Sequence, residues 1–460
     1  MKPTASMFES VLVANRGEIA LRIVRTCREM GIRTIAVYST SDRDSAAVRA
    51  ADEAIHIGPA EPRRSYLYMP AIIEAARLAN ASAIHPGYGF LSEDPDFAEV
   101  CAANNVIFIG PPPEVMASLG DKTRARKVLS EAGIPVLPGS SGPVMTVAEA
   151  GHIAGRIGFP LIIKAAAGGG GRGMTVVRDR SELARAYRST RAAARLAFGD
   201  DRVYLERFLD DARHIEVQIL ADNHGNVVHL GERDCSVQRR HQKLIEESPA
   251  PKLPAQVAAQ LGEYAIQGAA AVGYVGAGTF EFLVAGDEIA LIEVNCRIQV
   301  EHPVTEAVTG IDIVREQLLI SSGQPLTISQ LDVEPRGTAI ECRINAEDPE
   351  RNYAPCPGLL TEFTPPAGPF IRVDTHAFVG YRVPADYDSL IAKVIAWGPD
   401  RVTAIARMRR ALDEFQVSGP AVRTTTSLLA AVLASEKFRC GAHTTALLEN
   451  IETTSNPSVT

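Results

Sequence analysis

The chain has 460 residues, more than one hydrophobic core usually covers, so two or three domains are expected. Its net charge of −8 argues against nucleic acid as the main partner, because proteins that bind nucleic acids usually carry a basic surface. The seven cysteines are scattered and never stand in C-x-x-C spacing, which indicates reduced thiols without a disulfide framework or a zinc site. No apolar run is long enough for a signal peptide or a membrane span, so we expect a soluble, cytoplasmic protein without a membrane partner.

The first hundred or so residues alternate between strand-like and helix-like patterns. Short β-rich runs stand at 10–15, 32–39 and 105–110, and apolar residues recur at helical spacing in 16–31 and 69–80. Strands that alternate with helices predict βαβ units and a parallel sheet covered on both faces. The chain is therefore expected to begin with an α/β domain.

Two polar stretches of this part follow predicted strands. ANRGE (14–18) and HPGYGFLSE (85–93) stand at the carboxyl ends of strands, where parallel sheets bind their ligands. His85 and Tyr88 in the second stretch are typical of a loop at the edge of a substrate site, and an ordinary turn is the equal alternative. GPPPE (110–114) then breaks the pattern and predicts the first domain boundary.

From about residue 115 the pattern changes to α+β. Helices are predicted at 120–133, where a glycine ends the helix, and at 181–199. Two β-rich runs, 160–166 and 174–179, flank a run of glycines. Further strands follow, the last two joined by a short hairpin loop at 286–288; they are VYLERFL, HIEVQIL, VVHLGER, GTFEFLVA and IALIEVN.

A third region begins near residue 335 and is again rich in predicted strands. It ends with a helical pattern at 401–415, and the last residues form a polar tail that we expect to be flexible. The chain thus divides into an N-terminal α/β part, a central α+β part and a strand-rich C-terminal part.

The central part contains the run GGGGRG (168–173), which matches the G-x-G-x-x-G pattern of dinucleotide-binding loops. That interpretation is rejected, because the dinucleotide fingerprint must open a helix and a β-rich run follows instead. No Lys-Ser or Lys-Thr closes the run, so it is no Walker A loop either. A glycine loop between two strands, with Lys164 on the first, is typical of a cover over ATP phosphates; a plain mobile hairpin is the alternative.

The stretch IEVNCRIQVEH (292–302) carries the strongest chemical signal. If it stays extended, its alternation places five polar side chains on one face: Glu293, Asn295, Arg297, Gln299 and Glu301. A three-residue hairpin loop would also place Glu281 opposite Glu293. Facing carboxylates are destabilising unless a cation lies between them, and hard oxygen ligands suit Mg²⁺ that holds nucleotide phosphates. An ordinary exposed strand face is the alternative to this metal site.

A basic stretch, ERDCSVQRRHQK (232–243), stands out in this acidic chain. It carries five cationic or titratable side chains: Arg233, Arg239, Arg240, His241 and Lys243. A solvated basic face is the usual explanation for such a run, and a pocket for phosphate and a small oxyanion is at least as good a hypothesis. Cys235 is either a reactive thiol beside these cations or simply packed. Arg343 in CRINAED (342–348) is either a structural ion-pair partner or a cation that faces the site.

Seven stretches stand in the order and spacing of one protein family: VANRGEIALRIVRT, AIHPGYGFLSE, IIKAAAGGGGRGM, ERDCSVQRRHQK, GAGTFEFL, NCRIQVEHPVTE and ECRINAEDP. With these motifs the chain resembles the biotin carboxylases of the ATP-grasp superfamily. The resemblance implies a Rossmann-like pre-ATP-grasp domain (1–115), an ATP-grasp domain (116–330) with a lid at about 136–208, a biotin carboxylase C-terminal domain (331–450) and a flexible tail (451–460).

The resemblance also implies a reaction: ATP, bicarbonate and Mg²⁺ or Mn²⁺ are used to carboxylate N1 of biotin on a carrier protein. The residues it assigns to the nucleotide are Lys122, Lys164, Gly168, Gly169, Gly170, Gly171, Gly173, Met174, Glu206, Leu209, His214, Gln238 and His241. The metal ligands it implies are Glu281, Glu293 and Asn295.

The same resemblance implies how the other substrates bind. It assigns bicarbonate to Lys243, Arg297, Gln299 and Val300, with Glu301 as the general base that takes the bicarbonate proton. It places Arg343 against the biotin enolate and Tyr88 near the ureido ring. The implied catalytic set is therefore Glu301, Arg343, Lys243 and Arg297.

Three positions depart from the family's usual pattern. Cys296 stands where threonine or proline is common, and by alternation it faces away from the metal, so no loss of activity is expected. Arg207 replaces a frequent lysine in the hinge, and Asp386 replaces a frequent aromatic residue. No departure removes a catalytic group.

The sequence has no Met-Lys-Met site for biotin attachment, and no carboxyltransferase region follows residue 450. The chain thus resembles a stand-alone, homodimeric subunit of an acetyl-CoA or other acyl-CoA carboxylase in fatty acid synthesis. Its expected partners are a biotin carboxyl carrier protein and carboxyltransferase subunits. Two alternatives stay open: another ATP-grasp ligase that acts on a urea-like or oxo-acid substrate, and a non-catalytic subunit of a carboxylase complex.

Overall fold

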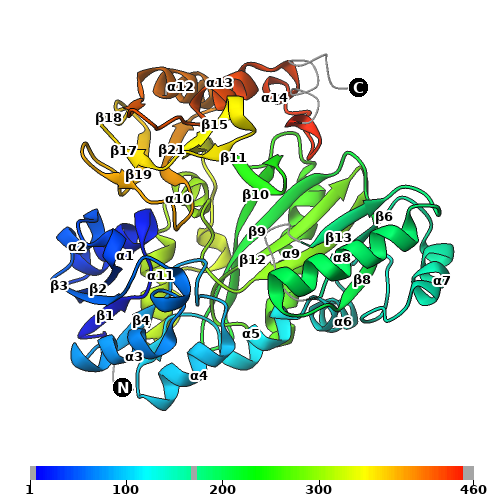
Figure 1. Ribbon diagram of the computed structural model, residues 1–460, viewed down its shortest axis with the longest axis horizontal. Coiled ribbons are helices and arrows are strands. Elements are labelled where there is room, and N and C mark those ends of the chain that lie inside the picture. Colours follow the sequence, from blue (N-terminus) through cyan, green and yellow to red (C-terminus); the bar gives the residue numbers. More distant parts are fainter. Residues whose placement is uncertain (1–6, 167–172, 449–460) are drawn as a thin grey trace.

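A computed structural model describes residues 7–166 and 173–448 of the chain. The N-terminal lobe, drawn in blue, and the C-terminal lobe, in orange and red, lie one above the other on one side of a central sheet (Figure 1). A smaller lobe projects from the opposite side (Figure 1). Within the described ranges, no helix is both long and apolar enough to cross a membrane. All seven cysteines lie in these ranges, and none forms a disulfide.

The N-terminal lobe is built on a parallel sheet of five strands in the order β3-β2-β1-β4-β5. The strands are β1 (Ser10–Val13), β2 (Arg33–Ser39), β3 (Glu53–Gly58), β4 (Ala83–His85) and β5 (Ile107–Phe108). The helices are α1 (Gly17–Glu29), α2 (Ala46–Ala50), α3 (Met69–Leu78), α4 (Pro95–Ala103) and α5 (Pro113–Gly120), with 3₁₀ turns at Thr40–Asp42 and Pro62–Arg64. Separate buried clusters join the sheet to α1 on one face and to α3 and α4 on the other, which confirms the predicted two-sided sheet.

The two polar stretches of this lobe lie side by side at the carboxyl ends of β1 and β4, as predicted. Val13 pairs with His85 in the parallel register. The side-chain amide of Asn15, just beyond β1, donates to the carbonyl oxygens of Pro86 (2.6 Å) and Tyr88 (2.7 Å) beyond β4. These bonds fix the loop that carries Tyr88 against the start of α1.

An antiparallel sheet of eight strands runs through the centre in the order β13-β12-β9-β10-β11-β14-β21-β19. Its strands are β9 (Arg213–Ala221), β10 (Val227–Arg239), β11 (Gln242–Ser248), β12 (Gly276–Ala285), β13 (Glu288–Asn295), β14 (Thr338–Asn345), β19 (Ile371–Thr375) and β21 (Leu390–Gly398). Strands β11 and β14 pair directly, so the central and C-terminal lobes share one sheet.

Helices cover this sheet on both faces. They are α6 (Lys122–Glu131), α9 (Ala255–Val272), α10 (His302–Thr309), α11 (Ile313–Ser321), α12 (Arg401–Glu414), α13 (Thr426–Ala434) and α14 (Glu436–Arg439). Helix α9 packs on β9 and β10, whereas α10 crosses β10, β11, β14 and β21. Short strands and turns complete the C-terminal lobe: β15 (Glu347–Asp348), β16 (Ala354–Pro355), β17 (Gly358–Leu359), β18 (Glu362–Thr364), β20 (Arg382–Val383), β22 (Gln416–Ser418) and 3₁₀ turns at Gln330–Asp332 and Pro349–Arg351.

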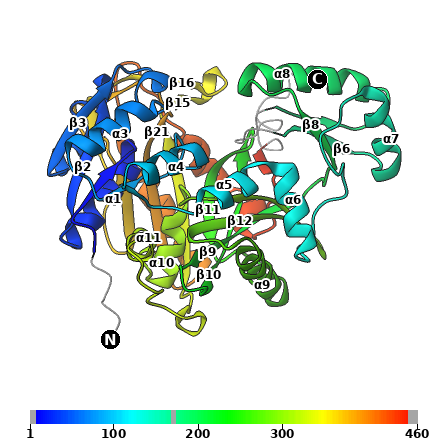
Figure 2. The same ribbon diagram turned by 90° about the horizontal axis from the view of Figure 1, so that it is seen from below.

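The projecting lobe contains the elements that flank the glycine run and is called the lid below. Its sheet has three strands in the order β7-β6-β8, covered by two helices (Figure 2). The elements are α7 (Val147–Ile157), β6 (Leu161–Ala165), β7 (Met174–Val177), α8 (Leu183–Phe198) and β8 (Val203–Arg207). The predicted strand–glycine loop–strand layout is confirmed, since β6 and β7 are antiparallel neighbours. Gly168, Gly169, Gly170 and Gly171 lie outside the described residues, and Gly173 has a positive φ of 68°.

Candidate active site

A row of charged residues crosses the central sheet at one level. Glu281 on β12 pairs with Glu293 on β13 and with Glu216 on β9. Glu216 pairs in turn with Arg233 on β10, and the two buried side chains form an ion pair. The predicted opposition of Glu281 and Glu293 is therefore confirmed, and it extends over two more strands.

The register between Glu281 and Glu293 arises differently from the prediction. Ala285 pairs with Glu288, so the hairpin turn has two residues, and the predicted three-residue loop is wrong. A register shift between Glu281 and Phe282 leaves Ile292 as an extra residue on β13. This bulge restores the opposition of the two glutamates and bends the strand beside the site.

The polar residues after β13 gather in a turn. The strand ends at Asn295 and α10 begins at His302, so the condition that the segment stays extended fails. Hydrogen bonds bring the side chains together instead. Arg297 donates to Oδ1 of Asn295 (3.0 Å) and to Oε1 of Gln299 (2.9 Å). Glu93, which follows the HPGYGFL loop, also accepts from Nε of Arg297 (2.9 Å). Glu93 was not itself predicted as a site residue, although it ends the stretch HPGYGFLSE (85–93) that was expected at the edge of the site.

Lys243 is the centre of the site. Its ammonium nitrogen lies 2.6 Å from Oε2 of Glu216, 3.0 Å from Oε1 of Glu281 and 2.7 Å from Oε1 of Glu301. Burial alone would lower the pKa of Lys243, but these carboxylates outweigh burial and raise the pKa well above its usual value. Lys243 is thus a fixed positive charge. Glu216 was not predicted, although the alternation in HIEVQIL places it on the same face as His214.

Glu301 caps the start of α10 and is enclosed by cations. Oε2 of Glu301 accepts from Arg343 (2.9 Å), while Oε1 faces Lys243. Burial would raise the pKa of Glu301, but Lys243, Arg343 and Arg233 outweigh burial and hold the pKa well below its usual range. Glu301 is therefore an ionised carboxylate that can accept a proton once another anion competes for its cations.

The three implied metal ligands lie together at the open side of the row. Asn295 donates to Oε1 of Glu281 (2.7 Å), and Lys122 donates to Oε2 of Glu293 (2.7 Å). Lys122 lowers the pKa of Glu293 despite burial, and Lys243 and His214 lower that of Glu281. Both glutamates are thus ionised oxygen donors, which suits a divalent cation that also binds phosphate.

A second acidic set lies deeper. The ligand atoms of His214, Glu216 and Glu281 lie within 4.8 Å of one another. Glu216 is fully buried and already pairs with Lys243 and Arg233, whereas the Glu293 side chain is 30 % exposed. An ion that bridges to phosphate oxygens needs the exposed side, so the geometry favours Glu281 and Glu293 over the deeper set.

Four of the expected nucleotide residues form two groups, one on the lid and one on the central sheet. On the lid, Lys164 donates to Oε2 of Glu206 (2.6 Å), and Arg126 on α6 pairs with the other oxygen. On the sheet side, Nε2 of His214 lies 2.7 Å from Oε2 of Glu281. Nδ1 of His214 faces the amide of Gln238 at 2.6 Å. Arg126 was not predicted, because it is one of four basic residues in α6 and no motif distinguishes it from the others.

The other expected nucleotide residues lie at the margins. Met174 opens β7, and Leu209 follows β8; both are half-buried. His241 is exposed at the turn between β10 and β11, where Arg240 and His241 both have positive φ. The neighbouring hinge residue Arg207 forms an ion pair with Glu288 at the start of β13.

Arg343 and Tyr88 face each other from two lobes. Nε of Arg343 on β14 donates to Oε1 of Glu246 (2.6 Å), so this guanidinium bridges Glu246 and Glu301. The hydroxyl of Tyr88 donates to Glu18 at the start of α1. Burial raises the pKa of Tyr88 well above its usual value, and the Arg343 charge opposes that rise. Lys393 on β21 lies behind them and bonds Glu18 (3.0 Å) and the carbonyl oxygen of Val300 (2.8 Å). Residues from three lobes thus meet at the Arg343 edge of the site.

For Cys235 and His85, the structure decides between the two alternatives that the sequence left open. Cys235 is fully buried, with Sγ 3.9 Å from Oε1 of Glu301, and burial raises its pKa well above the usual value. It is packed and not a reactive thiol. His85 is also fully buried, its Nδ1 accepts from the amide of Gly87 (3.1 Å), and burial lowers its pKa to about 3. His85 therefore shapes the loop and does not line a substrate edge.

The basic stretch 232–243 is not a solvated face as a whole. Arg233 and Lys243 are enclosed by the glutamates described above. Arg239 is largely covered and stacks on the ring of Tyr353 at 3.8 Å. Cys296 packs into a hydrophobic cluster and so faces away from the expected metal ligands, as predicted. The site thus concentrates cations and carboxylates in one buried place, which suits the handling of several anions at once.

Family models match the chain almost from end to end. "Biotin carboxylase, N-terminal domain" matches 7–116, "Carbamoyl-phosphate synthase L chain, ATP binding domain" matches 121–329, and "Biotin carboxylase C-terminal domain" matches 341–450. The chain belongs to the biotin carboxylase family. It is 53 % identical to "Biotin carboxylase" of Pseudomonas aeruginosa over 423 residues, which cover 92 % of this chain and 94 % of the relative.

Relatives of this biotin carboxylase family member carry more than one name. A relative from Methanothermobacter thermautotrophicus, named as part of a pyruvate carboxylase, is 49 % identical; the match covers 95 % of this chain and 88 % of the relative. A "Biotin carboxylase" of Nostoc is 50 % identical and covers 96 % and 99 %. The family is thus shared by components of carboxylases with different final acceptors.

Solved structures place the same fold around ligands. A biotin carboxylase of Campylobacter jejuni, solved as a β,γ-ATP complex, has a TM-score of 0.94 at 48 % identity and covers 96 % of this chain and 99 % of its own. The biotin carboxylase domain dimer of Hydrogenobacter thermophilus 2-oxoglutarate carboxylase has a TM-score of 0.94 at 45 % identity and covers 97 % and 98 %. That structure contains MgADP, ADP and bicarbonate. The expected three-part ATP-grasp architecture of this chain is confirmed.

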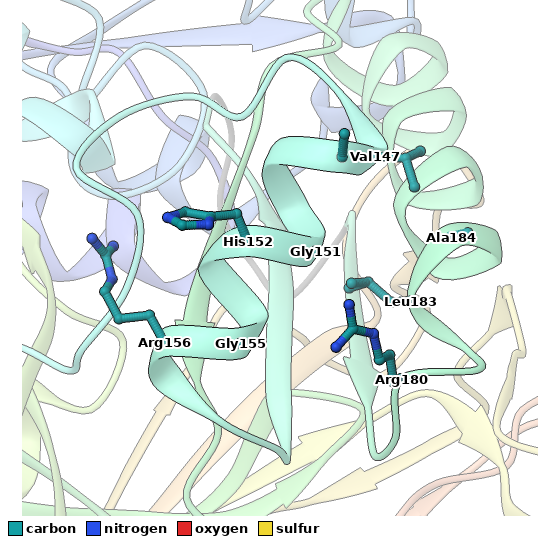
Figure 3. Close-up of a pocket in the computed structure, with 9 residues that line it drawn as sticks. Val147, Gly151, His152, Gly155, Arg156, Arg180, Leu183 and Ala184 are labelled. Carbon is teal, nitrogen blue, oxygen red and sulfur yellow. The ribbon is translucent and has the colours of Figure 1, made fainter.

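A cavity on the lid lies away from this chemistry. Its volume is about 790 Å³, and its lining residues come from α7, including Gly151 and Gly155, and from the segment that leads into α8, including Arg180 (Figure 3). None of the expected site residues lines this cavity. The candidate active site is instead the charged row on the central sheet, where carboxylates and cations pair with one another.

Proposed function

We propose that this chain uses MgATP and bicarbonate to carboxylate N1 of biotin on a carrier protein. One observation carries the proposal: Glu301 lies between Lys243 and Arg343, 2.7 Å and 2.9 Å from their nitrogen atoms. A proton acceptor flanked by two fixed cations suits a reaction in which one anion attacks another. The membership in the biotin carboxylase family supports the same reaction.

The nucleotide part of the proposal rests on the lid and on the open side of the row. Lys122, Lys164 and His214 would contact the nucleotide, with Glu206 and Leu209 in its hinge. Gly168 to Gly171, Gly173 and Met174 would cover the phosphates, and Gln238 and His241 complete the set. Glu281, Glu293 and Asn295 would hold Mg²⁺ or Mn²⁺, whose charge neutralises the phosphate oxygens between which the bond breaks.

Bicarbonate would enter between Lys243 and Arg297, against Gln299 and the backbone of Val300. Its negative charge competes with Glu301 for Lys243, which raises the proton affinity of Glu301. Glu301 then takes the bicarbonate proton as a bicarbonate oxygen attacks the γ-phosphorus, and ADP leaves. The product, carboxyphosphate, reacts readily with water, so a lid that closes first protects it.

Biotin would bind at the Arg343 edge with Tyr88 beside its ureido ring. The N1 proton passes to the phosphate group as it leaves carboxyphosphate, which places negative charge on the ureido oxygen, and the Arg343 guanidinium is a fixed cation that stabilises this charge. N1 then bonds to the carboxyl carbon that carboxyphosphate provides. Neighbouring residues of one site thus serve carboxyphosphate formation and biotin carboxylation in turn.

The partners belong to the same proposal. We propose the divisions 1–115, 116–330 and 331–450 as the domains of a homodimeric subunit in the cytoplasm. It would act with a biotin carboxyl carrier protein and the carboxyltransferase subunits of an acetyl-CoA or other acyl-CoA carboxylase. The 2-oxoglutarate and pyruvate carboxylase names among the relatives make the acceptor the first property to determine.

One assay tests the function. ADP release by the purified chain is measured with bicarbonate, with and without free biotin, and ¹⁴C-bicarbonate fixation into biotin is followed in parallel. We expect release that depends on bicarbonate and is stimulated by biotin. Release without biotin stimulation or fixation would favour an ATP-grasp ligase with another acceptor, and no bicarbonate-dependent release would favour a non-catalytic subunit.

A further inference from the structure

Two glutamates form a buried pair directly behind Arg343. Glu246 on β11 and Glu341 on β14 are register partners, so their side chains lie on the same face of the sheet. Both residues have no exposed surface. Two ionised carboxylates at such a place repel each other, so the pair must be compensated or must share a proton. Neither residue has a part in the proposed function as described so far.

Among the described residues, one cation forms a hydrogen bond with the pair. Arg343 donates to Oε1 of Glu246 at 2.6 Å and reaches Oε2 of Glu301 at 2.9 Å. In the described part of the chain, Oε2 of Glu246 and both oxygens of Glu341 have no hydrogen-bond partner. Arg343 therefore compensates Glu246 and Glu301, and no cation among the described residues bonds Glu341 directly.

No described residue forms a hydrogen bond with the Glu341 carboxyl group, although Lys393 and Arg343 act on it electrostatically. From β21, Lys393 is turned to Glu18 (3.0 Å) and to the Val300 carbonyl (2.8 Å). From α10, the charged group is Glu301, and β11 presents Glu246. Burial raises the pKa of Glu341 well above its usual value; the charges of Lys393 and Arg343 oppose the rise, and Glu246 and Glu301 add to it. Glu341 therefore holds a proton near neutral pH.

Glu246 differs from Glu341 because a cation, Arg343, bonds it directly. Lys243 on its own strand and Arg343 on β14 are cations, while Glu301 on α10 and Glu341 on β14 are carboxyl groups and Cys235 on β10 is a neutral thiol. Burial raises the pKa of Glu246 to about 7, with Arg343 opposing the rise. Glu246 is thus the member of the pair that ionises first as the pH rises.

We propose that Glu246 is the positioning residue for Arg343, and that Glu341 keeps Glu246 ionised by holding the single proton of the pair. The inference rests on the proposed function. When Glu301 takes a proton from bicarbonate, it loses its charge and its attraction for Arg343. Glu246 then remains the only anion on the guanidinium, so Arg343 stays at the biotin edge and its free N–H groups meet the ureido oxygen.

The proposal separates two rates. Carboxyphosphate formation uses Lys243, Arg297 and Glu301, whereas transfer to biotin also needs Arg343 in place. Loss of Glu246 should therefore reduce carboxylated biotin formed per ADP released. A residue with a purely structural role would lower both rates together, so this ratio is the diagnostic quantity.

The first test compares Glu246→Gln with Glu247→Gln in the full chain. Glu247 is the matched control, because it is equally buried on the same strand and pairs with Arg401 (2.6 Å) away from the site. For Glu246→Gln we expect biotin-dependent carboxylation to fall on the order of 10²-fold, since a misplaced catalytic group costs about that factor. For Glu247→Gln the carboxylation per ADP released should stay at the wild-type value. Equal ratios in the two variants would overturn the proposal.

The second test uses pH and Glu341→Gln. In the wild type, carboxylation per ADP released should fall as the pH drops below about 7, because Glu246 then takes a proton and releases Arg343. Glu246→Gln should have a low ratio that does not change between pH 6 and pH 8 (on the order of one unit either side of that value). Glu341→Gln should stay within about threefold of the wild type, because an amide resembles the neutral acid.

These outcomes distinguish the inference from the function on which it rests. A wild-type enzyme without biotin stimulation would contradict the proposed function. A biotin-stimulated wild type whose Glu246→Gln variant keeps the wild-type ratio and pH profile would contradict the inference alone. A loss in Glu341→Gln as large as that in Glu246→Gln would show that Glu341 acts as an ionised group, which also overturns the proposal.

Discussion

The two sides of the site are held together in different ways. On the sheet side, Lys243 lies within 3.0 Å of three buried carboxylates, which belong to Glu216, Glu281 and Glu301. On the lid, the Lys164–Glu206 pair is buried, and the other ion pairs are partly or largely exposed: Arg178–Asp210, Arg191–Asp201 and Arg202–Asp200. The sheet beneath has eight strands and the lid has three. The sheet side is thus organised before any ligand binds, whereas few buried charges stabilise the lid.

This difference matches the two tasks. Groups that stabilise developing charge work best when they are already fixed in place, because they need no reorganisation during the reaction. A cover over the phosphates must open for nucleotide exchange, and segments that open are usually those with few buried contacts. The contrast therefore predicts that substitutions on the two sides differ in kind as well as in size.

The largest effect is expected for Lys243→Met. Removal of the cation leaves three carboxylates buried together, which costs about 3–5 kcal/mol of unfolding free energy for a broken buried pair, and it abolishes turnover. Arg202→Met on the lid is the control, because its exposed pair with Asp200 contributes at most about 1 kcal/mol. Urea unfolding and ADP release measure both effects. Similar unfolding free energies for the two variants would remove the contrast.

The next effect concerns stability as a function of pH. The folded state keeps the pKa of Glu341 raised, so it binds a proton that the unfolded chain releases above the ordinary glutamate pKa. The wild type must then lose stability relative to Glu341→Gln as the pH rises, by about 1.4 kcal/mol per pH unit until Glu341 itself ionises. Urea unfolding from pH 5 to pH 8 (roughly the range between those two events) measures this slope. A pH-independent difference would show that Glu341 is ionised in the folded state.

A smaller effect is expected on the lid from Gly173→Ala. Gly173 has a φ of 68°, and an added Cβ would lie 3.2 Å from the Cβ of Ala165, so the glycine loop would be strained. We expect KM for ATP to rise about tenfold, which corresponds to the 1–2 kcal/mol cost of this backbone region. Gly199→Ala is the control, because Gly199 has a φ of 74° at the end of α8 and open space around it. Equal KM values for the two variants would separate the loop from nucleotide binding.

The smallest effect is expected for Cys296→Ala. Cys296 stands between two residues of the site, but its side chain packs into the hydrophobic cluster of β12, α6 and α9. We expect kcat to stay within about twofold and the unfolding free energy to fall by about 1 kcal/mol, since a small buried group is removed. Steady-state assays and urea unfolding measure the two quantities. A large loss of kcat would mean that the turn after Asn295 depends on the thiol.

Much of the architecture could be predicted because it depends on local patterns. The alternating strands and helices of the N-terminal lobe, the two strands around the glycine run and the helix at 401–415 all follow from periodicity. Helices α9 and α13 and strand β11 were not among the predicted elements. The motifs of the family then identified the architecture as a whole.

The site was less predictable, because its contacts join distant parts of the chain. Arg297 and Glu93 are 204 positions apart, and Arg126 and Glu206 are 80 apart, so no local spacing links them. The Glu281–Glu293 pair was predicted from a loop length that is wrong, and a bulge corrected the register. Burial of Cys235 and His85 depends on residues far away in the chain, such as Glu301 and Gln317, and the sequence alone does not specify these contacts.

The central claim is that Glu301 accepts the bicarbonate proton in a site that is organised before ligands bind. Glu301→Gln tests it most directly, through MgATP binding by calorimetry and ¹⁴C-bicarbonate fixation into biotin on the same preparation. We expect the Kd for MgATP to stay within about twofold and fixation to fall on the order of 10³-fold, the size typical of a lost general base. Fixation at a wild-type rate in Glu301→Gln would contradict the account.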